Sequence, residues 1–180
     1  MTSADEFAEF AEAAAPRLRR TAFLLCGDWH TAEDLTQSAL AKVFVSWRRI
    51  RRQDAAHAYA TRTLVNTYLA DKRLRRVEEV LTASVPDRPA ENAGPEDRML
   101  ALSALAALPA RARAVVALRY WEDLSVDQAA HVLGCTPGNV KSQTARALDK
   151  LRAGLAGAEA GTRIAPAGGS PRDSKAAQGG

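Results

Sequence analysis

The stretch from 124 to 151, LSVDQAAHVLGCTPGNVKSQTARALDKL, holds two helix-start signals on either side of Gly134. Ser125, with a glutamine three residues later, has the pattern of a capping box. Thr136 followed by Pro137 supplies an N-cap and a first-turn proline for a second helix. Gly134 stands where a helix commonly ends in a left-handed residue. A short helix, a glycine turn and a second capped helix predict a helix-turn-helix.

The second helix of this pair is expected to have two different faces. Its apolar face should pack inward and consists of Val140, Thr144, Ala147, Leu148 and Leu151. The opposite face is polar or small near the N-terminal end, which in this motif enters the major groove of DNA. The residues expected to contact duplex DNA are Thr136, Gly138, Asn139, Lys141, Ser142, Gln143 and Arg146.

Within this set the side chains suit different parts of the duplex. Asn139, Gln143 and Arg146 can read base edges, because their donors and acceptors match the major-groove pattern. Lys141, Ser142 and the helix N-terminus suit phosphates. The alternative interpretation is an ordinary helical hairpin whose polar face is simply solvated.

The bulk composition limits what the chain can be. Its 180 residues are 47% apolar and 26% charged, which is typical of a globular protein and allows two small domains. The acidic N-terminal segment lacks the features of a signal peptide, and no apolar run is long enough to enter a membrane, so we expect a cytoplasmic protein without membrane insertion. Two isolated cysteines and three scattered histidines have no metal-ligand spacing. No cofactor, metal or catalytic motif is expected, so the chain is predicted not to be an enzyme.

The chain divides by composition into four parts. The pattern predicts an all-α fold of two small helical domains joined by a flexible linker, with the helix-turn-helix in the C-terminal domain. The linker is acidic and contains three prolines, and the tail is rich in Ala, Gly, Pro and Ser. The predicted parts are a first domain at 1–76, the linker at 77–96, a second domain at 97–153 and a disordered tail at 154–180.

Three helices are expected in the first domain. Pro16 should break or kink the first of them. Thr31, with the aspartate three residues later, has the capping-box pattern and should open a second helix that runs to about Ile50. A third helix is predicted over 56–76, after a polar break.

The predicted second helix has a mixed outer face. Small, acidic and apolar side chains share it, which is a composition that a partner-binding helix can show. Because single exposed apolar residues are normal on any protein surface, a plain solvated face explains the pattern equally well. The outward residues include Asp34, Gln37, Ala41 and Val45.

The region from 48 to 76 is strongly basic. It carries nine arginine or lysine residues against two aspartates, which is an electrostatic footprint of nucleic-acid binding. On the predicted third helix, one line of side chains combines an aromatic ring, two arginines and an amide, a set suited to unpaired bases and backbone. That line is Tyr59, Arg62, Asn66 and Arg73. A basic, solvated helix is the alternative interpretation.

Three stretches together resemble a bacterial RNA polymerase sigma factor of the extracytoplasmic-function (ECF) group of the sigma-70 family, in its SigE-like actinobacterial subset. AEDLTQSALAKVFVSWRRI (32–50) is similar to the core-polymerase-binding helix. AYATRTLVNTYLADKRLRR (58–76) is similar to the helix that reads the −10 promoter element. LPARARAVVALRYWEDLSVDQAAHVLGCTPGNVKSQTARALDKLR (108–152) is similar to the domain that reads the −35 element.

The resemblance implies a factor for promoter-specific transcription initiation. Its partners would be promoter DNA and core RNA polymerase, contacted at the β′ clamp helices and the β flap, and whether an anti-sigma protein also binds stays open. Asp34, Gln37, Ala41 and Val45 would contact the clamp helices, and the helix-turn-helix residues would read the −35 duplex. The residues implied to capture the melted −10 strand are Arg51, Arg52, Tyr59, Arg62, Asn66 and Arg73.

One departure and two alternatives bear on this interpretation. Relatives often carry a second arginine in the recognition helix where this chain has Gln143, so base preference at −35 cannot be transferred. A free-standing helix-turn-helix regulator that acts as a dimer is the main alternative, although the basic third helix argues against it. A nucleic-acid-processing enzyme is a third class, and it would need measurable turnover.

Overall fold

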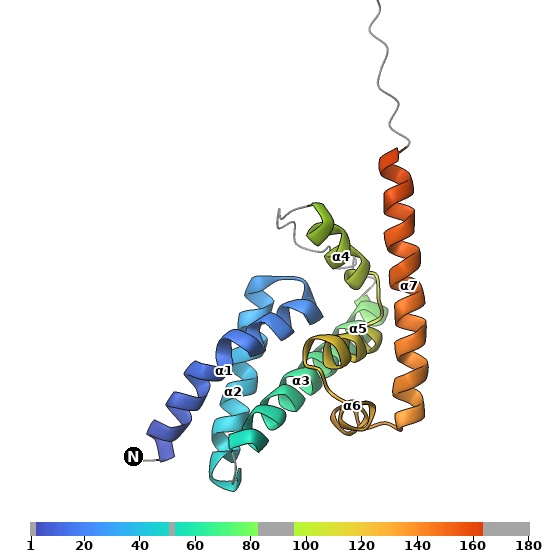
Figure 1. Cartoon of the computed structure of the whole chain (residues 1–180). Helices are drawn as coiled ribbons and strands as arrows, with labels where there is room; N and C mark the ends of the chain where they lie inside the picture. Colours follow the sequence, from blue (N-terminus) through green and yellow to red (C-terminus); the bar gives the residue numbers. More distant parts are fainter. Residues whose placement is uncertain (1–2, 51–52, 83–95, 164–180) are drawn as a thin grey trace, which may run out of the picture.

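The computed structural model describes residues 3–50, 53–82 and 96–163, and within them the chain is helical, without strands (Figure 1). The predicted all-α fold is therefore confirmed. None of the described helices is long and apolar enough to cross a lipid bilayer. The elements are α1 (Ser3–Cys26), α2 (Trp29–Ser46), the 3-10 turn η1 (Trp47–Arg49), α3 (Gln53–Thr82), α4 (Glu96–Ala106), α5 (Ala110–Val116), the π-helical turn η2 (Ala117–Trp121), α6 (Val126–Leu133) and α7 (Pro137–Arg163).

The helices α1, α2 and α3 pack on one another and form the N-terminal block. Three aromatic rings pack together at one end of the block. The ring centres of Phe7 and Phe10 lie 5.3 Å and 5.0 Å from the ring centre of Trp47. Pro16 lies inside α1 and does not end it. The helix continues because Ala14 and Leu18, on either side of the proline, are buried in this core and hold the flanking turns in place.

The turn between α1 and α2 corrects one prediction. Gly27 has φ +79° and its N–H donates to the Phe23 carbonyl at 2.7 Å, which ends α1. The Asp28 carboxylate then accepts hydrogen bonds from the N–H and hydroxyl of Thr31 at 2.7 Å and 2.8 Å. These bonds lower the pKa of Asp28. The predicted Thr31 capping box is wrong, because Asp28 directly after the glycine is the N-cap and α2 starts at Trp29.

Two helices extend beyond their predicted ends. The helix predicted over 56–76 runs through 53–82, where residues 77–82 contain no glycine or proline to stop it. The tail predicted to be disordered from 154 is helical to Arg163. In that extension α4 lies against α7, and a Cβ placed on Gly154 would be 3.6 Å from the Cβ of Ala104. The rest of the predicted linker (83–95) and of the tail (164–180) lies outside the described residues.

The helix-turn-helix forms as predicted. Ser125 Oγ accepts from the N–H of Gln128 at 3.1 Å, and Gln128 Oε1 accepts from the N–H of Ser125 at 2.7 Å, which completes the capping box of α6. Gly134 ends α6 with φ +60°. Thr136 Oγ1 then accepts from the N–H of Asn139 at 3.2 Å and caps α7. The inward face of α7 is buried at Val140 and Ala147.

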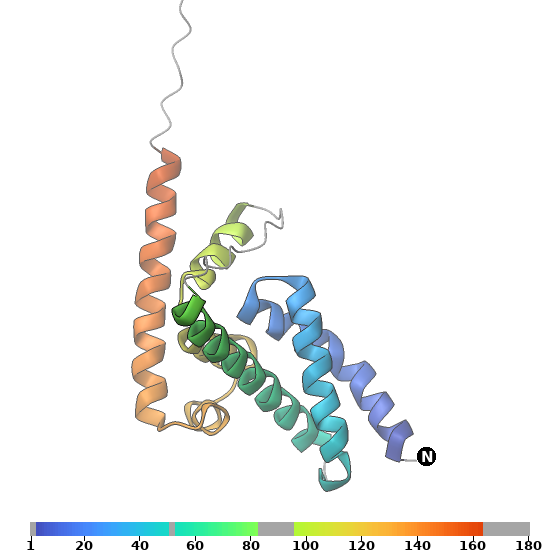
Figure 2. The same ribbon diagram turned by 180° about the vertical axis from the view of Figure 1, so that it is seen from behind.

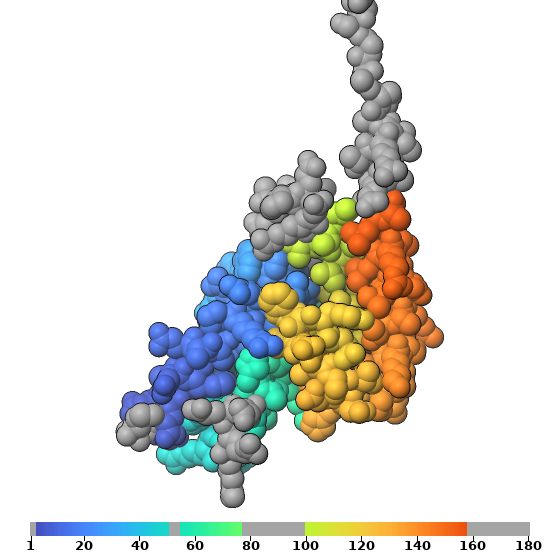
Figure 3. Space-filling model, in the orientation of Figure 1, coloured from blue at the N-terminus to red at the C-terminus, as the bar shows by residue number. Residues whose placement is uncertain are grey.

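The elements from α4 to α7 form the C-terminal block, which packs against the N-terminal block and shares one hydrophobic core with it. Helices α5 and α6 lie across α3, while α7 runs along the outside (Figures 1 and 2). Figure 3 shows the segment around η2 and α6, in yellow, directly against α1, in blue. Leu64 and Val65 of α3 join Leu118 and Val132 of the C-terminal block in this core, and all four are buried.

A buried carboxylate also joins the two blocks. Glu122 follows η2, and its side chain is only 2% exposed. Arg17 of α1 donates to Glu122 Oε2 from Nη2 at 3.0 Å and from Nε at 3.1 Å, and the Thr21 hydroxyl donates to Oε1. His57 Nε2 of α3 lies 3.6 Å from Oε2. We call these four residues the Glu122 cluster.

The Glu122 cluster predicts a pH-dependent stability. Burial raises the pKa of Glu122, but His57, Thr21 and the charge of Arg17 together lower it further, to below the ordinary 4.5. A lowered pKa means that ionised Glu122 stabilises the fold above about pH 4.5, and that this stability is lost as the pH falls through the pKa of the folded state. Glu122→Gln should lower the free energy of unfolding by about 1 to 3 kcal/mol at pH 7.

Urea unfolding of the wild type and Glu122→Gln at several pH values measures this effect. The difference in free energy of unfolding between the two proteins should decrease as the pH falls below about 4.5. Asp123→Asn is the matched control, because Asp123 is exposed and asparagine tolerates its left-handed backbone, with φ +54°, as aspartate does. A difference in free energy of unfolding that stays constant with pH would show that the charge of Glu122 does not stabilise the packing of the two blocks.

Gly134 gives a second prediction. Gly134→Ala forces a side chain into left-handed backbone and should cost about 1 to 2 kcal/mol in urea unfolding. Gly138→Ala is the control, since Gly138 is not in that region and has no atom within 4 Å of an added Cβ. That control should be neutral or stabilising by up to about 1 kcal/mol. Equal losses in both variants would contradict the assigned role of Gly134.

Candidate nucleic-acid interface

The first turns of α7 present an open polar surface. Asn139, Lys141, Ser142 and Arg146 are exposed there, and Gly138 leaves free space above the helix. The helix starts at Pro137, so the positive end of its dipole lies beside these side chains. The surface has the chemistry that a duplex requires, which is a positive helix end for phosphates and polar side chains for base edges.

Among the predicted base-reading residues, Arg146 is the most available. Gln143 is half-buried, and its amide donates to Asn139 Oδ1 at 2.7 Å. This bond joins the two amides to each other across one turn of the helix. Arg146 makes no hydrogen bond or ion pair with any described residue. Its guanidinium is therefore free to point into a groove.

The predicted line on α3 lies along one exposed edge of the helix. Tyr59, Arg62, Asn66 and Arg73 all reach the surface, and the Tyr59 hydroxyl donates to Ser46 Oγ at 3.1 Å. The two ends of the line differ: Tyr59 and Arg62 line a cavity between α3 and α6, whereas Asn66 and Arg73 do not border it. The other two residues predicted for this site, Arg51 and Arg52, lie outside the described residues.

The side chain of His131, in the helix-turn-helix, contacts the side chain of Arg62. Nη1 of Arg62 and Nε2 of His131, on α6, are 3.1 Å apart. A guanidinium has donors only, so in this hydrogen bond Arg62 donates and His131 Nε2 is the acceptor. The contact joins residues 69 positions apart in the sequence.

The outer face of α2 is open, as its predicted role requires. Asp34, Gln37, Ala41 and Val45 are all exposed, and Val45 is 84% exposed. Phe44 beside them is also 53% exposed, with its ring 4.9 Å from that of Phe7. The face predicted from the sequence did not include Phe44, although Phe44 directly precedes Val45, which was predicted to be exposed.

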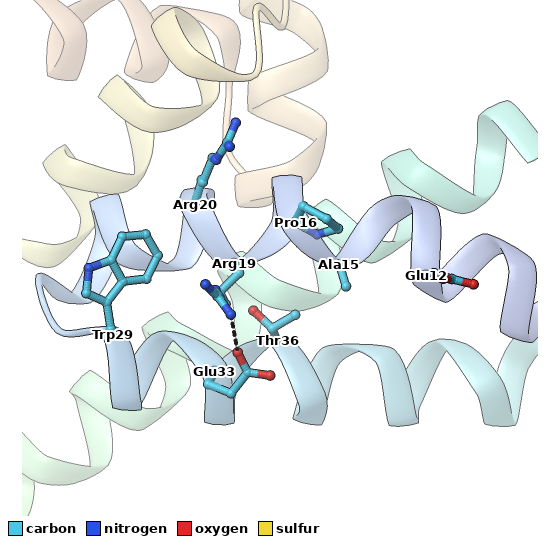
Figure 4. A pocket seen from close by; sticks show the side chains of 8 residues that line it. All are labelled: Glu12, Ala15, Pro16, Arg19, Arg20, Trp29, Glu33 and Thr36. Carbon is cyan, nitrogen blue, oxygen red and sulfur yellow. Dashed lines mark hydrogen bonds and ion pairs between the residues drawn. The ribbon is translucent and has the colours of Figure 1, made fainter.

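A small network sets the position of Gln37 on this face. Arg19 of α1 donates to Glu33 Oε2 at 3.3 Å, and its guanidinium lies 5.3 Å from the ring centre of Trp29 (Figure 4). Glu33 also accepts from the Gln37 amide at 3.3 Å, through its other oxygen. Figure 4 shows Arg19 pointing from α1 to Glu33 on α2, while Arg20 points away. The contacts of Glu33 with Arg19 and Gln37 therefore connect the outer face of α2 to α1.

Sequence reasoning missed the residues between the two blocks. A cavity of about 640 Å³ lies between α1, α3 and α6, and His57, Thr61 and Glu122 line it together with Tyr59 and Arg62. The partners of Glu122 on α1 are 105 and 101 positions away in the sequence, so no local pattern reveals them. Within the described part of the chain, no group of three or more side chains is arranged to hold a metal ion.

Comparison with family models divides the chain in the same order as its two blocks. The model for sigma-70 region 2 matches residues 10–77, which cover most of α1 to α3. The model for sigma-70 region 4 matches residues 98–151, which end in the helix-turn-helix. The region 2 match explains the N-terminal block without a dimerisation role, so a free-standing regulator is not favoured.

Individual relatives agree with this assignment. The chain is 38% identical over 149 residues to the RNA polymerase sigma-E factor of Streptomyces coelicolor, covering 82% of this chain and 84% of that protein. It is 34% identical over 151 residues to the ECF RNA polymerase sigma factor SigE of Mycolicibacterium smegmatis, covering 79% of this chain and 58% of that one.

A solved structure extends the likeness to three dimensions. The sigma factor RpoE of Bartonella quintana, in complex with the anti-sigma factor NepR, is similar with a TM-score of 0.68 and 26% identity. The match covers 84% of this chain and 97% of that one. The resemblance derived from the sequence is thereby confirmed: the chain belongs to the sigma-70 family as an RNA polymerase sigma factor of the ECF group, and it is SigE-like.

Proposed function

We propose that this chain binds core RNA polymerase and directs it to promoters through two separate DNA contacts. The observation that carries the proposal is the pairing of two different nucleic-acid surfaces on one chain. One is a capped, open helix-turn-helix suited to duplex DNA, and the other is a basic helix with an aromatic ring, suited to a single strand. The chain needs no catalysis of its own for this role, and it acts in the cytoplasm with the polymerase.

Each block then has one task in promoter recognition. Residues 1–76 form the domain for polymerase binding and the −10 element, and residues 97–153 form the domain for the −35 element. Residues 83–95 connect α3 to α4 between them, and α7 continues beyond the second domain to Arg163. The helix α7 enters the −35 major groove, where Arg146 reads a base and Lys141 and Ser142 contact phosphates.

The α3 line captures the melted strand of the −10 element. Removing a base from the stack costs a few kcal/mol, which stacking on Tyr59 and contacts from Arg62 and Asn66 must offset. Arg73, Arg51 and Arg52 contribute positive charge for the strand backbone.

The open α2 face is the proposed polymerase contact. Asp34, Gln37, Ala41 and Val45 contact the β′ clamp helices, and the second domain contacts the β flap. The exposed Val45, beside polar side chains, has the mixed character of a protein-binding surface. An anti-sigma protein is a further proposed partner, since the RpoE relative was solved in complex with NepR.

Run-off transcription tests the proposed function. Purified chain added to core polymerase of Streptomyces coelicolor should produce transcripts from specific start sites, and Val45→Asp should abolish them by placing a charge on the contact face. Tight binding to a palindromic duplex without polymerase, together with no specific transcripts, would refute the proposal in favour of a dimeric regulator.

Arg146→Ala tests the duplex contact. At a matched −35 sequence the variant should lose about 1 to 3 kcal/mol of binding free energy, and its preference should relax at one base position. Fluorescence anisotropy on duplexes that differ at single positions measures both effects. An equal loss on all sequences would instead assign Arg146 to a phosphate.

Asn66→Ala tests the strand contact. The variant should impair promoter opening while duplex binding at −35 stays intact, because Asn66 lies on α3 and is not part of the α7 surface. Permanganate reactivity of thymines in the −10 element reports opening. Unchanged reactivity would remove Asn66 from the strand contact.

A further inference from the structure

The cavity between α1, α3 and α6 has the size of a site for a small molecule. Its volume of about 640 Å³ falls within the range of about 300 to 1,000 Å³ that small-molecule pockets cover. Such pockets combine a mainly apolar lining with a few polar groups that fix the orientation of the ligand. The side chains of this cavity have that composition, and they indicate which class of ligand fits.

Part of the lining is apolar and aromatic. Ala58 of α3, with Leu124 and Val132 of the C-terminal block, supplies aliphatic surface. Tyr59 also lines the cavity and is 38% exposed. A partly exposed aromatic ring can stack on a flat ring of a ligand, and every nucleobase has such a face. This part of the cavity therefore favours a ligand with a flat aromatic group.

A buried hydroxyl in the lining lacks a hydrogen-bond partner. Thr61 is buried, and its Oγ1 makes no hydrogen bond with any residue that the structure describes. Thr63 and Thr67 on the same helix differ, because their hydroxyls donate to the carbonyls four residues back at 2.7 Å and 2.8 Å. A hydrocarbon ring in the cavity would leave the Thr61 hydroxyl unpaired, which is costly. A heterocycle with nitrogen and oxygen atoms on its edge can pair with it.

The exposed side of the cavity carries a positive charge that an anion can use. Arg17 lines the cavity but is paired with Glu122 at 3.0 Å. Arg62 is exposed and donates to the neutral acceptor His131 at 3.1 Å. A guanidinium has five N–H donors, and the bond to His131 uses one of them. Arg62 can therefore bind a phosphate, which accepts several guanidinium hydrogen bonds at once.

We propose that this cavity is a binding site for a free nucleoside monophosphate. The phosphate binds Arg62, and the base lies between the ring of Tyr59 and the hydroxyl of Thr61. The Asp127 carboxylate, which also lines the cavity, accepts hydrogen bonds from the ribose hydroxyls. The proposal goes beyond the proposed function and does not depend on it, because the ligand is a small molecule in solution and not a promoter.

Titration of the full chain with AMP, GMP, CMP and UMP in turn tests the proposal. Isothermal titration calorimetry should show one saturable site for at least one of the four nucleotides. The corresponding nucleoside and inorganic phosphate, each added alone, should bind about tenfold more weakly or worse, because each lacks part of the contacts. The proposal is overturned when none of the four nucleotides binds saturably at millimolar concentration, or when phosphate alone binds as tightly as the nucleotide.

Thr61→Val tests the contact with the base. The substitution removes the hydroxyl and keeps a β-branched side chain, so it should weaken nucleotide binding by about threefold to tenfold. Thr63→Val is the matched control, because it makes the same change on the same helix at a residue that does not line the cavity. The control should bind like the wild type, and equal affinities of the two variants would contradict the proposal.

Arg62→Ala tests the contact with the phosphate. The variant should bind the nucleotide only as tightly as its nucleoside, while its affinity for the nucleoside stays at the wild-type value. Arg20→Ala is the control, since Arg20 is an exposed arginine that does not line this cavity. Wild-type affinity of Arg62→Ala for the nucleotide would place the phosphate elsewhere and overturn the proposal.

Amide chemical shifts of the wild type locate the ligand even if a variant unfolds. Addition of the nucleotide should shift the signals of residues 55–62 of α3 and 126–132 of α6. Shifts concentrated at the start of α7 would place the nucleotide on the duplex surface and overturn the proposal. These titrations contain neither polymerase nor promoter, so specific run-off transcripts without nucleotide binding would retain the proposed function and reject only the nucleotide site.

Discussion

A carboxylate that is removed from water must find its hydrogen-bond partners inside the protein, and Glu122 finds them on the other block of the chain. Arg17 and Thr21 supply donors from α1, and His57 approaches from α3. Leaving the ionised Glu122 in place without them would be costly, so its burial requires the blocks to be together. The position of α6 over α3, the cavity and the Arg62 contact all depend on this arrangement.

Local signals in the sequence were enough to predict the helix-turn-helix and the α2 face. Caps act within a few residues, which is why Ser125, Gly134 and Thr136 could be interpreted from their neighbours alone. The same reasoning failed at Thr31, because two cap patterns overlap there and the conformation of Gly27 decides in favour of Asp28. The exposed line on α3 also followed from helical periodicity.

Contacts between the blocks could not be predicted in this way. In the sequence, nothing distinguishes Glu122 from an exposed acidic residue in a turn. Its burial depends on where α1 and α3 lie in space. The ends of α3 and α7 were missed for a related reason, since composition suggested a linker and a tail where helix is continuous. Packing of α4 on α7 at Gly154 is a tertiary effect that no propensity scale contains.

The shared core has a consequence for the solubility of the chain when no partner is bound. Separated blocks would each expose an apolar face, with Leu118 and Val132 on one and Leu64 and Val65 on the other. Exposed patches of this kind promote aggregation. Packing of the two faces on each other protects the unbound chain from aggregation. Either block expressed alone should therefore be less soluble than the whole chain.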